Sequence, residues 1–203
     1  MSSCVSTTVR FYGKEDALDR LENLIKEWRS KKYCDNGWDR DSESDLIWLG
    51  NIVGNSGIDV RSKGDFKIYC RGYICDVDRS EGYLTIMQET KNQIAVEMWR
   101  KIVEKYDLDL EVIYWSECDC CNYMTNDPHY ENRYVIDCIN NELYDKDFPD
   151  FDDEVSKETL IEMLQKLLST KINDIEELIE KVEEEYDDIW FHQWDVVPLS
   201  ECP

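Results

Sequence analysis

The order of strand-like and helix-like segments limits this chain to few folds. Residues 5–12 are rich in β-branched and aromatic side chains, which favours a strand. Residues 14–31 then repeat apolar side chains at helical spacing. Similar strand or helix patterns follow at 66–77, 83–88, 92–106 and 108–115. The resulting order, β-α-β-β-α-β, predicts an α+β fold of the ferredoxin-like split βαβ type, an antiparallel sheet with helices on one face.

Three further segments complete the predicted organisation. Residues 33–65 are polar and Gly-rich around one apolar patch, "LIWLGNIV", and are predicted to form an insertion loop. Residues 131–138 predict one more strand, which closes a ferredoxin-like domain over residues 1–140. The composition then changes to an acidic linker, two amphipathic helices and an aromatic closing strand. This acidic helical annex, residues 141–203, is expected to pack on the same domain.

Both annex helices carry sequence signals for their first residues. Ser156 precedes a segment with apolar residues at helical spacing, and a serine at that position accepts a hydrogen bond from the first turn. Asn173 is followed three residues later by Glu176, a spacing that resembles a capping box. The sequence therefore predicts helix starts at Ser156 and Asn173.

The net charge of -23 is large and unevenly distributed. Residues 1–140 hold 26 acidic and 18 basic side chains, a net charge of -8. Residues 141–203 hold 20 acidic and 5 basic side chains, a net charge of -15. Such an excess destabilises a compact state through self-repulsion, and it disfavours nucleic acid as a direct partner because phosphates are bound by Lys and Arg. We expect a basic protein surface as the partner.

The sequence gives no indication of export or of a membrane span. Its first residues lack an apolar segment of signal-peptide length. The longest uncharged run, Leu46 to Ile58, has 13 residues and contains Gly and Asn, so it is too short and too polar to cross a bilayer. We expect a soluble protein in the cytoplasm of a bacterial host cell. The nine cysteines are then expected to be reduced.

Three short motifs point to a known family. They are "QETKN" with Glu89–Thr90, "MTNDP" with Thr125–Asp127, and "NRYVID" with Arg133, Tyr134 and Asp137. In these motifs, and in its acidic helical tail, the chain resembles the YubB-like proteins, which have a ferredoxin-like domain and are encoded by plasmids, integrative elements and phages. The resemblance covers residues 66–195, with its core between 83 and 138. It implies a fold and a mobile-element setting, and no catalytic residues.

The segment "SECDCCNYMTNDPHYENRYVIDC", residues 116–138, concentrates cysteines and one of the two histidines. Zinc is held by four Cys or His ligands in a tetrahedron, and strong zinc motifs pair two closely spaced ligand couples. Only one such couple is present, so we interpret the cysteines as ordinary thiols and expect no cofactor. The alternative is a zinc-stapled or RNA-contacting regulatory module. Its metal ligands would be Cys118, Cys121, His129 and Cys138, and strand tyrosines at positions 69, 73 and 83 would stack RNA bases.

The acidic residues of the last predicted helix recur at steps of three and four residues. They therefore share one face, opposite Ile175, Leu178 and Val182. Eleven helical residues extend about 16 Å, in which one DNA strand carries a phosphate every 3.4 Å or so. The partner-binding residues predicted from this density are Glu176, Glu177, Glu180, Glu183, Glu184 and Asp187, with Asp145, Asp147, Asp150, Asp152 and Asp153 as a second row.

These observations predict a binding protein and not an enzyme. No nucleophile motif or phosphate-binding loop is recognisable in the sequence. The aromatic residues Trp190, Phe191 and Trp194 follow the acidic helix and are expected to anchor a partner. The expected function is anti-CRISPR-like: a nucleic-acid-mimic surface binds and inhibits a nucleic-acid-handling defence effector of the host, with a CRISPR nuclease as the favoured target.

Overall fold

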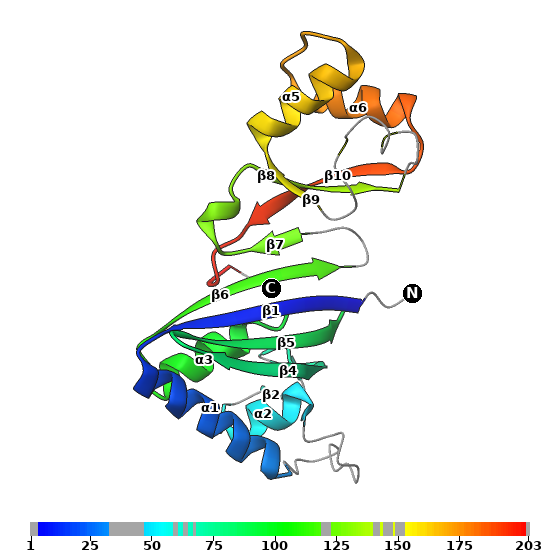
Figure 1. Ribbon diagram of the computed structural model, residues 1–203. Coiled ribbons are helices and arrows are strands. Elements are labelled where there is room, and N and C mark those ends of the chain that lie inside the picture. Colours follow the sequence, from blue (N-terminus) through cyan, green and yellow to red (C-terminus); the bar gives the residue numbers. More distant parts are fainter. Residues whose placement is uncertain are drawn as a thin grey trace. The chain divides into compact units, whose positions relative to one another are not determined.

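The computed structural model describes residues 4–32, 47–58, 61–62, 65–66, 68–118, 123–139, 143, 148 and 153–201. The chain divides into two compact units. The first comprises residues 1–120, 124–127 and 197–203, and the second comprises residues 121–123 and 128–196. Both contain helices and strands, so the protein is of mixed α+β class (Figure 1). Among the described residues, no helix has the length and apolarity needed to cross a membrane.

The first unit is built on four antiparallel strands in the order β4-β5-β1-β6. They are β1 (Cys4–Gly13), β4 (Gly72–Ser80), β5 (Tyr83–Lys91) and β6 (Leu110–Cys118). Along β1, the residues Val5, Val9 and Phe11 are buried at every second or fourth position, as expected for a strand with one face in the core. Short strands also occur at β2 (Arg61–Ser62), β3 (Asp65–Phe66) and β7 (Tyr123–Thr125), the last divided between the two units.

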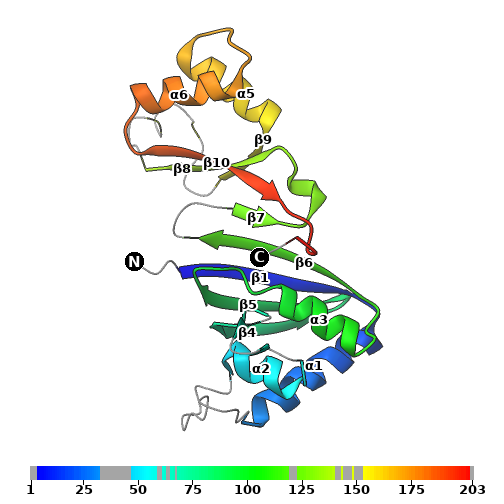
Figure 2. The same ribbon diagram turned by 180° about the vertical axis from the view of Figure 1, so that it is seen from behind.

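Three helices lie together against this sheet (Figure 2). They are α1 (Glu15–Ser30), α2 (Leu49–Asn55) and α3 (Glu97–Lys105). Trp99 of α3 is fully buried, and its ring meets the edge of Phe11 with 5.8 Å between centroids. Its indole Nε1 donates to Gln88 Oε1 at 2.8 Å, so the one polar atom of the indole is satisfied inside the core. Trp99 thus joins α3 to strands β1 and β5.

Part of the predicted insertion loop is a buried helix, and that prediction is wrong for residues 49–55. In α2, the residues from Leu49 to Gly54 are all buried. The Nδ2 group of Asn51 donates to the carbonyl oxygens of Trp28 and Lys31, which ties α2 to the end of α1. With its apolar side chains in the core of the first unit, α2 is a packing element. Residues 33–46 of the predicted loop lie outside the described residues.

The turn between β4 and β5 is a tight hairpin. Ser80 pairs with Tyr83, which leaves Glu81 and Gly82 as a two-residue hairpin loop. Gly82 has a φ of 82°, a left-handed conformation that glycine adopts without strain. The Gly82 N–H donates to Glu15 Oε1 at 2.7 Å, so the hairpin is joined to the first turn of α1.

The same contact makes a pH-dependent contribution to stability. The Gly82 hydrogen bond, followed by the hydrogen bond and charge of Arg79, lowers the pKa of Glu15 below its usual 4.5. A lowered carboxyl pKa stabilises the fold above the usual pKa, and this stabilisation is lost as pH falls through the lowered value. We expect Glu15→Gln to be less stable than the wild type at about pH 7, and the difference to shrink as pH falls below 4.5 and through the lowered pKa. Thermal unfolding of both proteins over a series of pH values measures this. A difference that does not change with pH would contradict the assignment.

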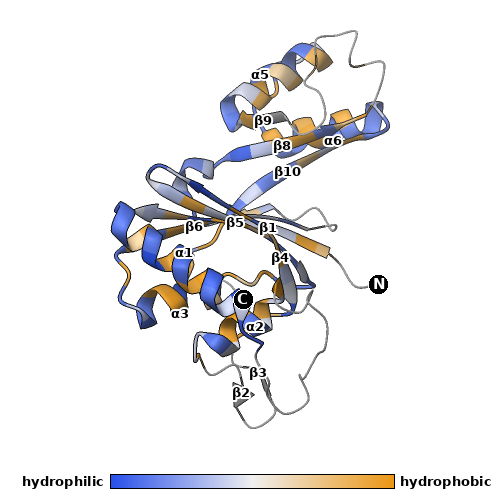
Figure 3. Cartoon of the chain, turned by 60° about the horizontal axis from the view of Figure 1, so that its bottom comes forward, coloured by the Kyte–Doolittle hydropathy of each residue, from blue (hydrophilic) through white to orange (hydrophobic). Residues whose placement is uncertain are grey.

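The second unit contains a three-stranded antiparallel sheet in the order β10-β8-β9, with two helices. Its elements are the 3₁₀ turn η2 (Pro128–Tyr130), β8 (Arg133–Cys138), β9 (Asp153–Ser156), α5 (Lys157–Leu168), α6 (Ile175–Glu185) and β10 (Ile189–Val196). Both helices carry apolar and polar stripes (Figure 3). Buried residues of the sheet and helices form one apolar core, and they include Tyr134, Ile136, Leu160, Leu164, Ile175, Leu178, Val182 and Ile189.

The division between the units differs from the predicted boundary at residue 140. Strand β8 lies within residues 1–140, but it pairs with β10 and β9 of the second unit. The physical reason is that Tyr134, Ile136 and Cys138 point into the core under α5 and α6. In addition, residues 153–156 of the predicted acidic linker form strand β9. The annex is therefore a compact unit that includes β8.

The predicted start of α5 is confirmed, whereas that of α6 is displaced by one residue. Ser156 accepts a hydrogen bond from Thr159 N at 3.2 Å and caps α5. The cap of α6 is Asp174, whose Oδ1 accepts from Glu177 N at 3.0 Å. Asn173 instead accepts a hydrogen bond from Gln165 Nε2 at 2.8 Å, so its amide is used between the two helices. A capping box at Asn173 and Glu176 is thus not formed.

This cap predicts different effects for two neighbouring residues. Asp174→Ala removes the acceptor for the first turn of α6 and is expected to lower the free energy of unfolding by about 1 kcal/mol. Asn173→Ala removes one exposed hydrogen bond and is expected to change it by less than about 0.5 kcal/mol. Urea unfolding followed by circular dichroism compares the two variants. A larger loss for Asn173→Ala would show that the cap is misassigned.

Candidate partner-binding surface

One face of α6 presents carboxylates to solvent. Ile175, Leu178 and Val182 are buried beneath the helix. Opposite them, Glu176, Glu177, Glu180, Glu183 and Glu184 are all exposed, and we call this set the α6 acidic face. The alternation follows from helical periodicity, because residues three and four apart lie on the same side. The α6 acids singled out from the sequence therefore share one solvent-accessible surface.

The α6 acidic face is poorly compensated by positive charge. In the described part of the chain, its one ion pair joins Lys181 Nζ to Glu177 Oε1 at 3.6 Å. Both side chains are about half exposed, and such pairs contribute little because solvent screens them. Like charges at helical neighbours also destabilise a helix by a few tenths of a kcal/mol per pair. Packing of α6 against the core does not by itself require so many neighbouring carboxylates on the exposed face.

The excess is greatest at the C-terminal end of α6. A helix carries a partial negative charge at this end, where basic side chains are favourable. The last turn of α6 has no basic residue. It holds Glu183, Glu184 and Glu185, and exposed Asp187 and Asp188 follow directly. Helix and side chains thus add their negative potentials at one place, which is a favourable position for a cation.

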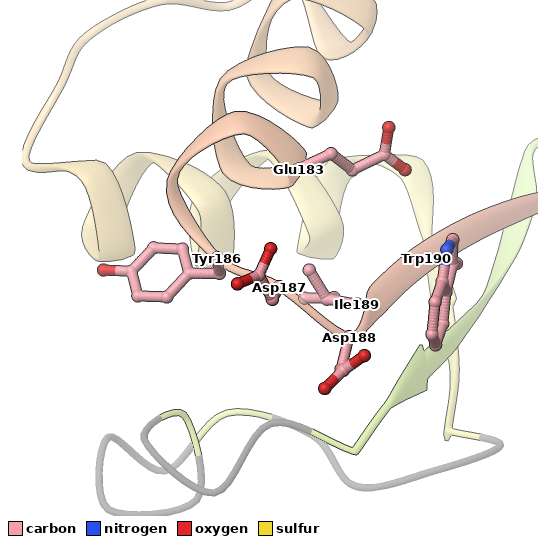
Figure 4. A pocket seen from close by; sticks show the side chains of 6 residues that line it. All are labelled: Glu183, Tyr186, Asp187, Asp188, Ile189 and Trp190. Atoms are coloured by element: carbon pink, nitrogen blue, oxygen red, sulfur yellow. The ribbon is translucent and has the colours of Figure 1, made fainter.

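A concavity of about 480 Å³ opens at this end of the helix. We call it the α6–β10 concavity. It is lined by Glu183, Tyr186, Asp187, Asp188, Ile189 and Trp190. Figure 4 shows Tyr186 and Trp190 at opposite ends, with the two aspartates and Ile189 between them and Glu183 on the last turn of α6. Aromatic and acidic groups therefore surround one depression.

The aromatic residues expected to anchor a partner differ in accessibility. Trp190 is 45% exposed and lines the α6–β10 concavity. Trp194 is only 7% exposed, and its ring contacts those of Tyr123 and Tyr130 with centroids 5.3 Å and 4.8 Å apart. Phe191 is half-buried against the core of the second unit. Trp190 remains an accessible anchor, whereas Trp194 presents little surface because two tyrosine rings cover it.

A side-chain hydrogen bond joins strands β8 and β10 of the second unit. Tyr134 donates from its hydroxyl to Gln193 Oε1 at 3.3 Å, which links β8 and β10 beneath α6. Burial, followed by the nearby charge of Glu176, raises the pKa of the Tyr134 phenol above its usual value. The phenol therefore stays protonated and keeps its donor at neutral pH.

The second row of acids predicted from the sequence cannot be placed. Asp145, Asp147, Asp150 and Asp152 lie outside the described residues. Asp153 is the first residue of β9, and only its backbone is described. The candidate surface is therefore built from α6 and the turn that follows it.

The ligands of the alternative zinc site are distributed over both units. Cys118 ends β6 in the first unit, and Cys121 lies outside the described residues. His129 is exposed on η2, with its ring 6.0 Å from that of Tyr130. Cys138 is 1% exposed and packs in the apolar core of the second unit. Within the described ranges, no three His, Cys, Asp or Glu side chains are grouped to hold a metal ion.

The tyrosines of the RNA-contacting alternative occupy different environments. Tyr73 of β4 is 42% exposed. The Tyr83 ring is covered by the guanidinium of Arg10, which lies 4.8 Å from its centroid and 5.2 Å from that of Trp115. Tyr69 lies before β4 and packs partly against the core of the first unit. Arg10 occupies the Tyr83 face that a base would need.

Two motif residues have roles that the sequence did not reveal. Asn126 acts as a strand partner for β6, since its Oδ1 accepts from Tyr114 N and its Nδ2 donates to Val112 O, both at 2.8 Å. Asp137 lies 3.1 Å from His192 Nε2, between neighbouring strands of the second unit. Both side chains of that pair are about 15% exposed. Alternation along β8 and β10 is the signal that could have placed Asp137 and His192 on one face.

Comparison with known proteins identifies no relatives. No family model matches the chain, and no curated protein or solved structure is significantly similar to it.

Proposed function

We propose that this protein is a non-enzymatic inhibitor from a mobile genetic element, which binds a nucleic-acid-handling defence effector of a bacterial host. The α6 acidic face and the α6–β10 concavity would occupy a basic groove of that effector. A CRISPR nuclease is the favoured target, because its positively charged channel binds a nucleic-acid backbone. The observation that carries the proposal is the row of exposed carboxylates, which has one weak counter-ion among the described residues and ends in more acid at the negative end of the helix dipole.

The charge density is suited to such a groove. The helix extends about 16 Å, and one DNA strand carries about five phosphates in that length. The α6 acidic face offers five carboxylates within that length, over about 12 Å. Complementary charge of this kind accelerates association and gives rates that fall as salt rises.

The proposed fold and family agree with the first unit. We infer a ferredoxin-like split βαβ for it, since its antiparallel order β4-β5-β1-β6 follows the sequence order 2-3-1-4 of the principal strands. The motifs shared with YubB-like proteins occupy structural positions that support this inference. Thr90 is buried and its Oγ1 donates to Gln93 O at 2.6 Å, and Asn126 pairs with β6. The proposed membership of the YubB-like family rests on these motifs and on the strand order.

Affinity capture from bacterial lysate tests the function. The tagged protein is expected to retain a nucleic-acid-binding protein at about 50 mM salt and to release most of it by about 200 mM, because several charge contacts contribute to the affinity. The captured protein is then assayed for nuclease or DNA-binding activity with and without the purified chain. Capture that is insensitive to salt, or a captured protein that works normally when saturated with this chain, would refute the proposal.

A further inference from the structure

The α6–β10 concavity has features of a site for one side chain in addition to those of a charged surface. Its volume, about 480 Å³, lies within the range of roughly 300–1,000 Å³ found for small-ligand sites. Its lining combines three carboxylates with two aromatic rings and Ile189. Such a mixture fits a ligand group that is both cationic and flat, since carboxylates attract its charge and aromatic faces accept its plane.

One apolar residue of the lining, Trp190, is accessible to solvent. In the second unit, the exposed large apolar side chains are Trp190, at 45%, and Ile139, at 53%, among the described residues. They belong to one neighbourhood, because Ile139 N donates to the carbonyl oxygen of Asp188 at 3.0 Å. Exposed apolar groups beside acids are typical of contact surfaces where a buried anchor lies within a polar rim.

Two of the lining carboxylates lack a basic partner: among the described residues, no Lys or Arg forms an ion pair with Glu183 or Asp188. The two carboxylates also point to different sides of the concavity, with Glu183 above and Asp188 below the turn (Figure 4). Carboxylates that do not converge are poorly arranged for a single metal ion, in agreement with the absence of a metal-type cluster in the described ranges.

We propose that the α6–β10 concavity binds the guanidinium group of one arginine of the partner, a proposal that rests on the function proposed above. The guanidinium would stack on the Trp190 indole and donate to Asp188, while Glu183 would add negative charge from the other side of the concavity. Arginine is favoured over lysine because its plane stacks on an indole, its donors are spread over a fork, and it is more weakly hydrated than an ammonium group. The partner residue would insert where the helix dipole of α6 is negative.

Binding of labelled hexa-arginine and hexa-lysine to the full chain tests this site. At about 50 mM salt, fluorescence anisotropy is expected to show salt-dependent binding of both peptides, with hexa-arginine several-fold tighter. Trp190→Ala is expected to weaken hexa-arginine on the order of tenfold and hexa-lysine much less. Asp188→Asn removes the charge while keeping a residue that tolerates the left-handed φ of 60°, and it is expected to weaken hexa-arginine several-fold.

Two matched controls separate the site from general charge. Tyr73→Ala removes an exposed aromatic residue of the first unit, and Glu158→Gln removes one exposed charge of α5. Both are expected to leave the preference for hexa-arginine unchanged. The arginine site is refuted if hexa-arginine binds the wild type, Trp190→Ala and Asp188→Asn with equal affinity. It is also refuted if the wild type binds hexa-arginine no more tightly than hexa-lysine. In both cases the acidic surface is retained. If neither peptide binds the wild type, both proposals are refuted.

Discussion

Replacing Glu176, Glu180, Glu183 and Glu184 by lysine is expected to abolish partner binding at low salt. These exposed carboxylates lie on one face of α6. The reversal places lysines against a basic groove, and this repulsion costs several kcal/mol of binding free energy. Each 1.4 kcal/mol or so changes Kd by a factor of about ten. We therefore expect the affinity for the captured effector to fall at least about 100-fold. Surface plasmon resonance with the purified effector measures it, and an inhibition assay follows the same variant.

A control with the same change in net charge makes the result specific. Asp16, Glu81, Asp109 and Glu111 are exposed acids of the first unit, and their replacement by lysine leaves the second unit intact. This variant should lose only the modest affinity that comes from net charge at long range. Equal losses for the two variants would mean that net charge and not the α6 acidic face determines binding. Circular dichroism verifies that both variants are folded.

Trp99→Ala is expected to give the largest loss of stability of any single substitution considered. Trp99 is fully buried and contacts Phe11, and its removal leaves a large cavity and an unpaired Gln88 Oε1. Substitutions of buried Trp or Phe by Ala cost about 3–5 kcal/mol. Urea unfolding, followed by near-ultraviolet circular dichroism of the first unit, should show a decrease of that size.

Trp190→Ala is the matched control for this substitution. Trp190 is 45% exposed, so its removal opens no core cavity and should change the free energy of unfolding by less than about 0.5 kcal/mol. The two substitutions thus separate stability from binding, because Trp190 is assigned to partner contact and Trp99 to the core. A loss below about 1 kcal/mol for Trp99→Ala would contradict the packing of α3 on β1 and β5.

The elements with strong periodicity were predictable from sequence. The helix at 14–31 is observed as Glu15–Ser30, and the closing strand at 189–197 as Ile189–Val196. The short helix α2 was not predictable from sequence. It spans seven residues, contains two glycines and is almost wholly buried, so its sequence lacks the alternation of polar and apolar faces that predicts a helix. The strand predicted at 131–138 is observed as β8, but its placement in the first domain differs, because pairing with β10, more than fifty residues later, is a long-range property.

The candidate site was predictable in part. Helical spacing alone places Glu176, Glu180 and Glu183 on an exposed face. The α6–β10 concavity was not predictable, because it depends on the left-handed turn at Asp188 that leads the chain from α6 into β10. Trp194 shows the same limit: its alternation with Trp190 places both on one face of the strand, but Tyr123 and Tyr130 cover only Trp194.

The most direct test of the central claim is a competition experiment with the captured effector. Its own nucleic-acid ligand, fluorescently labelled, is bound to the effector and titrated with this protein at constant salt. If the α6 acidic face occupies the nucleic-acid groove, the labelled ligand is displaced completely, and the reversal variant displaces none over the same range. A stable ternary complex of effector, nucleic acid and this protein would contradict the claim.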